Sequence, residues 1–237
     1  MWTTPRSVEP EWLDDLPAND MRALRSRHEL RRVNGWMLQS AIMAHALRKH
    51  CGSDAPRTVL DLGGGDGTFM LRVARRLAPH WRKVALITVD RQSIVTAQTR
   101  KSFRALNWSV ESVAADVLEF LQSANVPLMD VITANLLLHH FQDEPLTRLL
   151  TGVARRTRRF VACEPRRNPS AMLASRMLWA LGCGEVTRHD AVVSVRAGFN
   201  GSELSKFWLK QAQWELDERS LMFTHRFAAC RRNGITR

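Results

Sequence analysis

The 237-residue sequence contains no tyrosine and only four cysteines, none of them in a Cys-x-x-Cys pair. The scattered cysteines indicate neither a zinc site nor a disulfide framework. No apolar run approaches the roughly 20 residues that a membrane-spanning helix needs, and the first residues lack a signal-peptide pattern. We therefore expect a cytoplasmic protein with no metal site and no membrane span, in which no tyrosinate can serve as a base.

Lysine is also scarce and occurs at only five positions. The chain has a net charge of +12, and nearly all of its positive charge comes from arginine. Nucleic acid, an anionic substrate or an acidic carrier protein could each explain this charge. The arginine runs, however, fall in or beside amphipathic segments, where charge usually lies on a solvated surface. Since no nucleic-acid-binding module is recognisable, we favour a solvated surface and do not expect a nucleic-acid partner.

Residues 58–69 are the most informative stretch. Residues 58–62 form a short apolar run, three alternating glycines follow at Gly63, Gly65 and Gly67, and apolar residues then recur at helical spacing. This order predicts a buried strand, a loop and a helix. Alternating glycines allow a ligand to lie against backbone N–H groups at a helix N-terminus. A tight turn with nothing bound is the alternative, but we favour a cofactor site.

Two acidic residues narrow the choice of cofactor. Asp90 ends a second apolar run 23 residues after Gly67, about where a βαβ unit presents a carboxylate to ribose hydroxyls. Asp61 lies two residues before Gly63, where it would repel the two phosphates of a dinucleotide but would attract a cationic ligand. The pattern therefore favours a cationic nucleoside.

The pattern Asp61-x-Gly63-x-Gly65-x-Gly67 resembles the signature loop of class I S-adenosylmethionine-dependent methyltransferases. The resemblance extends through most of the chain and implies S-adenosylmethionine as cofactor, with S-adenosylhomocysteine as product. It also implies that the loop lies against the methionine and ribose parts of the cofactor. The other implied cofactor-binding residues are Asp90 and Arg91 near the ribose, Asp116 and Val117 near the adenine, and Asn135.

Strands and helices alternate from residue 57 onward. We expect strands at residues 58–62, 84–89, 108–113, 129–134, 160–163, 214–218 and 221–230. The resemblance to the methyltransferase family implies that the last two form an antiparallel hairpin. Alternation of this kind predicts an α/β fold with helices on both faces of a mostly parallel sheet. The family resemblance makes it a Rossmann-like sheet of seven strands. We divide the chain into an N-terminal helical cap, residues 1–50, and a cofactor-binding domain, residues 51–237.

A second motif, Leu-Leu-Leu-His-His-Phe, follows the expected fourth strand and contains His139 and His140. It resembles a run beside the transferring methyl group in small-molecule methyltransferases, and differs from the Asn/Asp-Pro-Pro-aromatic motif of enzymes that methylate nucleobases. An imidazole has an ordinary pKa of about 6.5 and could accept the proton of an acidic hydroxyl group. Each histidine is thus a candidate base, although a histidine in a loop is more often structural.

The expected substrate site combines the helical cap with residues 187–199. Trp36 and Met37 could supply an apolar wall, or could simply bury one side of a helix. Residues 187–199 carry few helix signals, so we interpret them as a lid in which His189 is a third candidate base and Arg196 could bind an anionic group. The alternative is a structural connection over the edge of the sheet.

The expected activity is methylation of a small molecule. Several motifs resemble bacterial methyltransferases associated with secondary metabolism, including those encoded beside type III polyketide synthases, which suggests O- or C-methylation of a phenolic or polyketide-type acceptor. The alternatives are an RNA or other nucleic-acid methyltransferase and a non-catalytic regulatory protein that binds the cofactor. The sequence does not indicate an oligomeric state.

Overall fold

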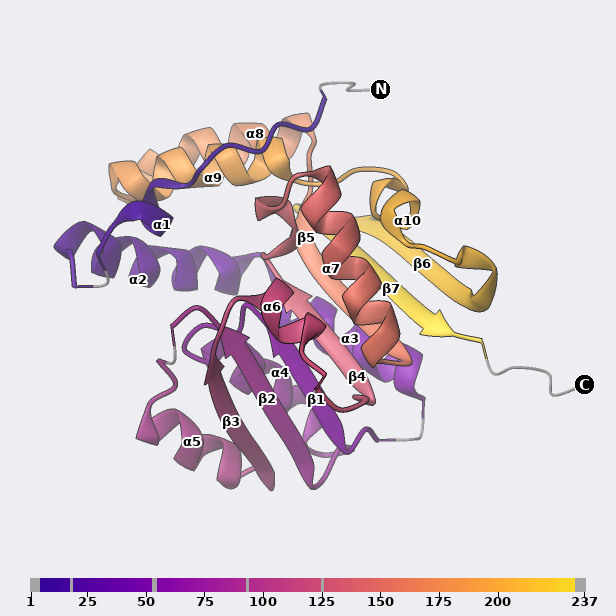
Figure 1. Ribbon diagram of the computed structural model, residues 1–237. Coiled ribbons are helices and arrows are strands. Elements are labelled where there is room, and N and C mark those ends of the chain that lie inside the picture. Colours follow the sequence, from indigo (N-terminus) through magenta and orange to yellow (C-terminus); the bar gives the residue numbers. More distant parts are fainter. Residues whose placement is uncertain (1–4, 18, 53–54, 93, 125, 233–237) are drawn as a thin grey trace, which may run out of the picture.

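The fold is a single seven-stranded sheet covered by helices (Figure 1). The computed structural model describes residues 5–17, 19–52, 55–92, 94–124 and 126–232, with the side chains of Asn34 and Trp36 outside the description. The strand order is β3-β2-β1-β4-β5-β7-β6. β7 runs antiparallel to both β5 and β6, while the other neighbouring strands are parallel. The predicted seven-stranded, mostly parallel α/β sheet is confirmed.

The observed strands are close to the predicted ones. They are β1 (Thr58–Leu62), β2 (Val84–Asp90), β3 (Trp108–Ala114), β4 (Val131–Asn135), β5 (Arg159–Pro165), β6 (Trp214–Leu221) and β7 (Thr224–Arg231). β4 begins two residues later than predicted because Met129 forms only an isolated bridge with Thr157. The hairpin turn lies later than predicted, at Met222 and Phe223, where Met222 has a φ of 48°.

Helices cover both faces of the sheet. One face packs against α3 (Gln39–Cys51), α4 (Thr68–Leu77) and α5 (Ala97–Arg104), and the other against α6 (Val117–Gln122), α7 (Asp143–Arg156) and α10 (Glu203–Phe207). Side chains of β1 alternate between these two layers, since Val59 faces the first and Leu60 and Leu62 face the second. None of the helices in the described part of the chain has both the length and the apolar character that a membrane crossing requires.

A helical cap lies at one end of the sheet, above the carboxyl ends of the parallel strands (Figure 1). It consists of α1 (Trp12–Asp15), α2 (Met21–Trp36), α8 (Pro169–Arg176) and α9 (Glu185–Ala197), with a 3-10 segment (Met177–Leu181) after α8. The cap therefore joins two separated parts of the chain, whereas the sequence suggested residues 1–50 alone. Of that range, α3 packs on the sheet beside α4.

The prediction of a lid at residues 187–199 is wrong, because most of this segment belongs to α9. Its buried positions include Val186, Asp190, Val193 and Ala197, which follow helical spacing. The β-branched run that includes Val192, Val193 and Val195 disguised the helix, because such residues have a modest helix propensity that tertiary packing overrides.

Candidate active site

The glycine loop joins β1 to α4 and lies over the end of β2. The N–H groups of Gly63 and Gly64 donate to the carbonyl oxygen of Val89 at 2.8 and 3.3 Å. A Cβ atom on Gly64 would lie 2.9 Å from the Thr88 Cβ atom, so this position has no room for a side chain. Gly63 adopts a φ of 68°, which favours glycine. The sequence thus holds the loop close to the ends of β1 and β2.

Asp61 lies beneath this loop. Its side chain is buried, its Oδ1 atom accepts a hydrogen bond from Thr133 Oγ1 at 2.7 Å, and burial raises its pKa to about 7. The carboxylate is not among the groups that line the cavity beside the loop. Its influence on a bound ligand therefore has to pass through the loop backbone or through its charge.

A cavity of about 510 Å³ opens beside the loop. Predicted cofactor-binding residues line it, namely Gly63, Asp90, Arg91, Asp116 and Val117. Figure 1 shows why they meet, since the parallel strands that precede them end at the same edge of the sheet.

The carboxylates of Asp90 and Asp116 in this cavity already accept hydrogen bonds from backbone N–H groups. Asp90 accepts hydrogen bonds from the N–H groups of Gly65 at 3.0 Å and Gln92 at 3.1 Å, which ties the glycine loop to the end of β2. Asp116 caps α6 by accepting from Leu118 N–H at 2.8 Å. Each carboxylate keeps acceptor capacity, because an ionised carboxylate offers about four lone pairs.

An orphaned polar atom provides a further test of the fit. Asn135 ends β4, and its Oδ1 atom is buried with no hydrogen-bond partner among the described residues. A buried acceptor of this kind is costly unless it is paired. The glycine loop, Asp90 and Asp116 fit a ligand that carries hydroxyl and amino donors, as S-adenosylmethionine does, whereas Asn135 is not among the residues that line the cavity.

A second cavity, of about 340 Å³, lies beneath the helical cap. Its walls are mainly apolar and come from α2, α8, α9 and the 3-10 segment after α8, with Met37, predicted as substrate-binding, among them. The two cavities share three lining residues, Glu11, Leu136 and His140. Leu136 adopts a φ of 53°, which is strained for a leucine, and such strain is concentrated at functional sites.

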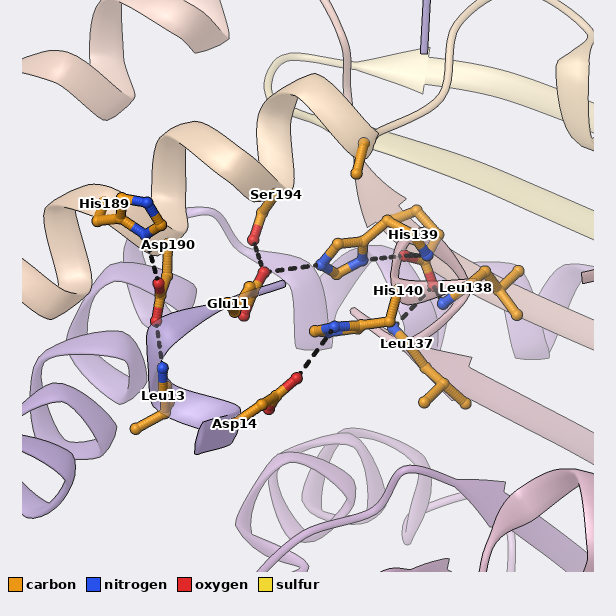
Figure 2. Close-up of polar contacts among 12 residues, drawn as sticks. Glu11, Leu13, Asp14, Leu137, Leu138, His139, His140, His189, Asp190 and Ser194 are labelled. Atoms are coloured by element: carbon orange, nitrogen blue, oxygen red, sulfur yellow. Dashed lines mark hydrogen bonds and ion pairs between the residues drawn. The ribbon is translucent and has the colours of Figure 1, made fainter. Parts of the chain in front are cut away.

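At this junction His139 lies between Glu11 and Glu164, and Figure 2 shows its contact with Glu11. Its Nδ1 atom donates to Glu164 at 2.7 Å, and its Nε2 atom lies 3.4 Å from Glu11, which also accepts a hydrogen bond from Ser194. Burial alone would lower the pKa of His139, but the hydrogen bonds and charges of the two glutamates outweigh it and raise the pKa to about 9. His139 is therefore an imidazolium at neutral pH.

Glu164 fixes the backbone of this motif as well as the ring. Its carboxylate is fully buried and accepts hydrogen bonds from the N–H groups of Leu137, Leu138 and His139 at 3.1, 2.9 and 3.3 Å. The residue lies near the end of β5, so it holds the turn after β4 against the neighbouring strand. The position of both histidines therefore depends on Glu164.

His140 has a different environment. Its ring borders both cavities, and its Nδ1 atom lies 3.6 Å from Asp14. Burial lowers the pKa of His140, and the neighbouring positive charge of His139 lowers it further. A neutral imidazole at the junction of the two cavities can accept a proton, which the protonated His139 cannot do.

Residues 5–16, which we call the N-terminal strap, bring Glu11 and Asp14 to the site. Arg6 donates to the carbonyl oxygens of Ala197 at 2.8 Å and Phe141 at 2.6 Å. The buried Asp190 of α9 accepts from the N–H groups of Trp12 and Leu13 at 2.9 and 3.0 Å (Figure 2). The strap is thus held at both ends, and its residues form one wall of the 510 Å³ cavity.

Two of the predicted catalytic and substrate-binding residues, His189 and Arg196, lie outside both cavities, and the predicted cofactor-binding residues Asp61, Gly65, Gly67 and Asn135 do not line either cavity. His189 stacks on Trp12 with ring centroids 3.8 Å apart and bonds to Asp190, so in the structure it supports the strap. Arg196 forms an ion pair with Glu9 at 3.8 Å. The Trp36 side chain lies outside the described part of the chain, so its predicted role stays a prediction.

Sequence reasoning missed the residues that reach the site across long sequence distances. Glu11, Asp14 and Arg6 lie in a segment without hydrophobic periodicity, and no local signal marks them. Glu164 had one signal, its place at the carboxyl end of a strand, but pairing with a nearby arginine would have explained it equally well.

The central part of the chain matches a known family. Residues 59–159 match the family model described as methyltransferase domain. This segment therefore resembles a methyltransferase domain, which agrees with the enzyme class predicted from the glycine loop. No curated protein sequence matches the chain.

Solved structures show the same fold. An O-methyltransferase family protein from Burkholderia thailandensis matches with a TM-score of 0.60 at 20% identity, over 92% of this chain and 62% of that one. The plantazolicin methyltransferase BpumL, solved with a substrate analogue and S-adenosylhomocysteine, matches with a TM-score of 0.64 at 13% identity over 93% of both chains. At these identities the likeness shows the fold, which is that of class I methyltransferases.

A third structure carries the cofactor itself. Magnesium protoporphyrin IX methyltransferase from Synechocystis, solved with S-adenosylmethionine bound, matches with a TM-score of 0.52 at 11% identity over 93% of this chain and 88% of that one. S-adenosylmethionine is thus a cofactor of this fold, in agreement with the prediction from the loop. The chain spans less than two thirds of the Burkholderia protein but nearly all of BpumL.

Proposed function

We propose that this protein transfers a methyl group from S-adenosylmethionine to a hydroxyl group of a small, largely apolar molecule. The observation that carries the proposal is the meeting of the two cavities at Glu11, Leu136 and His140. One cavity has the carboxylates and glycine loop suited to a nucleoside, and the other has apolar walls. A donor and an acceptor held in these cavities would meet where a neutral imidazole is available.

The lining of the second cavity indicates the class of acceptor. Among its lining residues the ionisable groups are Glu11, His139 and His140, and no arginine or lysine contributes, although the chain carries 35 of them. An anionic acceptor would be repelled by Glu11 and unpaired elsewhere. The cavity therefore favours a neutral molecule with a large apolar surface, such as a phenol or an aromatic polyketide.

In the proposed reaction S-adenosylmethionine supplies an activated methyl group on a sulfonium and leaves as S-adenosylhomocysteine. The residues of this chain align the acceptor and exclude water. Leu136 and the strap residue Glu11 line the junction, and His140 accepts the proton that the acceptor hydroxyl loses when its oxygen forms the new bond to carbon. The imidazolium of His139 stays paired with Glu11 and Glu164.

The relatives support an acceptor from secondary metabolism, since one acts on plantazolicin and another belongs to the O-methyltransferases. We extend the proposal to bacterial secondary metabolites, including products of type III polyketide synthases, and to a cytoplasmic location.

Binding and turnover measurements test the function. Calorimetric titration should show binding of S-adenosylmethionine and not of NAD, and mass spectrometry of a panel of phenols should detect addition of one methyl group. Binding of cofactor without methylation of any phenol, alcohol or amine would favour a non-catalytic role. Preferential methylation of RNA would show that the acceptor is a nucleic acid instead.

Asp90→Ala tests the cofactor site. We expect this change to weaken binding of S-adenosylmethionine by roughly 1–3 kcal/mol, because it removes an acceptor for the ribose and the contact to Gly65 N–H. Asp66→Ala is the matched control, since Asp66 belongs to the same loop but does not line the cavity. Equal affinities of the Asp90→Ala variant and the unmodified protein would remove Asp90 from the site.

A further inference from the structure

A cavity of about 760 Å³ lies at the end of the sheet that faces away from the helical cap. It forms where β1, β4 and β5 begin and β7 ends, which Figure 1 shows at the end of the sheet away from α1 and α2. Hydrogen bonds hold these segments together, including one from Arg231 N–H to the Arg158 carbonyl oxygen at 2.8 Å and one from Arg57 N–H to the Asp130 side-chain carboxylate at 2.8 Å. The cavity therefore has a rigid frame.

Five arginines line this cavity. They are Arg57, Arg158, Arg159, Arg231 and Arg232. In the described part of the chain none of them forms an ion pair or a side-chain hydrogen bond. Four of the five side chains are exposed, and Arg159 is half-buried.

Among the described residues, a single carboxylate lines the cavity, and it already accepts several hydrogen bonds. Asp130 accepts hydrogen bonds from the backbone N–H groups of Arg57 and Thr58 and from Thr58 Oγ1, at 2.8, 3.0 and 3.2 Å. The single negative charge of Asp130 offsets only part of the positive charge of the five guanidinium groups. Like charges gathered in a concave site repel one another, and the surrounding protein strengthens their field relative to a flat surface.

We propose that this cavity binds a compact anion that carries two or more phosphate groups. Guanidinium groups match phosphate oxygens with paired hydrogen bonds, and five of them exceed the charge of a single phosphate. The concave shape, with Leu128 and Met129 as an apolar wall, fits a compact ligand such as a nucleoside diphosphate better than an extended nucleic-acid backbone. The site does not depend on the proposed methyl transfer, because it lies at the other edge of the sheet.

Calorimetry with pyrophosphate at constant ionic strength tests the proposal. We expect saturable binding at one site, weakened at least tenfold in the double variant Arg158→Ala/Arg232→Ala. The matched control is Arg75→Ala/Arg76→Ala, which removes the same charge from exposed positions of α4. The control should retain the affinity, since its arginines lie outside the cavity. Both double variants should still bind S-adenosylmethionine, which shows that they are folded.

Three outcomes would overturn the proposal. The first is no saturable binding of pyrophosphate, and the second is an equal loss of affinity in both double variants, which would reduce the effect to net charge. The third is tighter binding of a single-stranded oligonucleotide than of pyrophosphate with the same dependence on Arg158 and Arg232, because the ligand would then be an extended polymer. Failure of methyl transfer in the unmodified protein would leave these results unaffected.

Discussion

Two adjacent histidines in one sequence motif acquire opposite properties through distant residues. His139 gains a proton because Glu11 and Glu164 approach it from segments 128 residues before and 25 residues after it in sequence. His140 remains neutral because it is buried beside that charge. The sequence identified both histidines as candidates, but the choice between them depends on contacts that no local pattern records.

His140→Asn should lower kcat about 100-fold or more, within the range that general base catalysis contributes, while the affinity for S-adenosylmethionine changes little. The asparagine retains a polar group of similar size but cannot accept the proton. Steady-state kinetics with a phenolic acceptor provide the measurement. His80→Asn is the matched control, because His80 is exposed and lies outside both cavities, and its kcat should stay within about twofold. A similar loss in both variants would argue against His140 as the base.

The Glu11–His139 pair should make stability depend on pH. The pKa of His139 rises from 6.5 to about 9 on folding, so its contribution is complete below about pH 6.5 and is lost as the pH rises through 9. The pKa of Glu11 falls from 4.5 to about 2 despite burial, because His139 and Ser194 donate to it, so its contribution is present above about pH 4.5 and is lost toward pH 2.

Thermal unfolding between pH 5 and 10 measures this dependence. The unfolding midpoint should decline from about pH 7 to pH 10, and Glu11→Gln should flatten the decline, since neutral glutamine no longer favours the imidazolium. Thr147→Ala, at a half-buried position of α7, is a control whose curve should run parallel to that of the unmodified protein. A parallel curve for Glu11→Gln would show that the pair does not control the pH dependence.

At the scale of elements, local patterns predicted the sheet well and the cap poorly. The apolar positions Met70, Val73, Ala74 and Leu77 are all buried in α4, as their spacing predicted, because a helix over a sheet has only one face to bury. In α9 one face contacts the strap and another contacts α8. Its sequence therefore does not show a single apolar stripe at helical spacing. The strap has no periodicity because individual polar contacts hold it.

Asp190→Asn should loosen the strap. The change removes the charge that holds Trp12 N–H, Leu13 N–H and the His189 ring, while keeping the size of the buried side chain. Chymotrypsin should then cleave after Trp12 or Leu13 several-fold faster, because cleavage follows the population of the open segment. Asp20→Asn is the matched control, since Asp20 caps α2 in a similar way but holds no part of the strap. Unchanged cleavage in Asp190→Asn would indicate that other contacts secure the segment.

At the scale of the whole molecule, the sequence predicted the fold class and the end of the sheet at which the cofactor binds. It did not predict the cavity beneath the helical cap or the arginine-lined cavity at the opposite end of the sheet. Strand alternation and the glycine loop are local, and the antiparallel hairpin came from the family resemblance. The 340 Å³ cavity instead arises where the strap, α2, α8 and α9 meet, over sequence separations that no motif spans. The five arginines at the opposite end of the sheet also looked like surface charge, because they come from three segments that only the fold brings together.

Because the strap, the glycine loop and α6 all border the cofactor cavity, a ligand there should stabilise cap and sheet together. At a concentration 100 times its dissociation constant, S-adenosylhomocysteine should stabilise the folded state by about 2.7 kcal/mol. For a chain of this length each kcal/mol raises the unfolding midpoint by about 2–4 °C, so a single transition should shift upward by about 5–10 °C. Differential scanning calorimetry provides the measurement, and Asp90→Ala at the same ligand concentration should shift less. Two separate transitions, with only one moved by the ligand, would mean that the cap folds independently of the cofactor site.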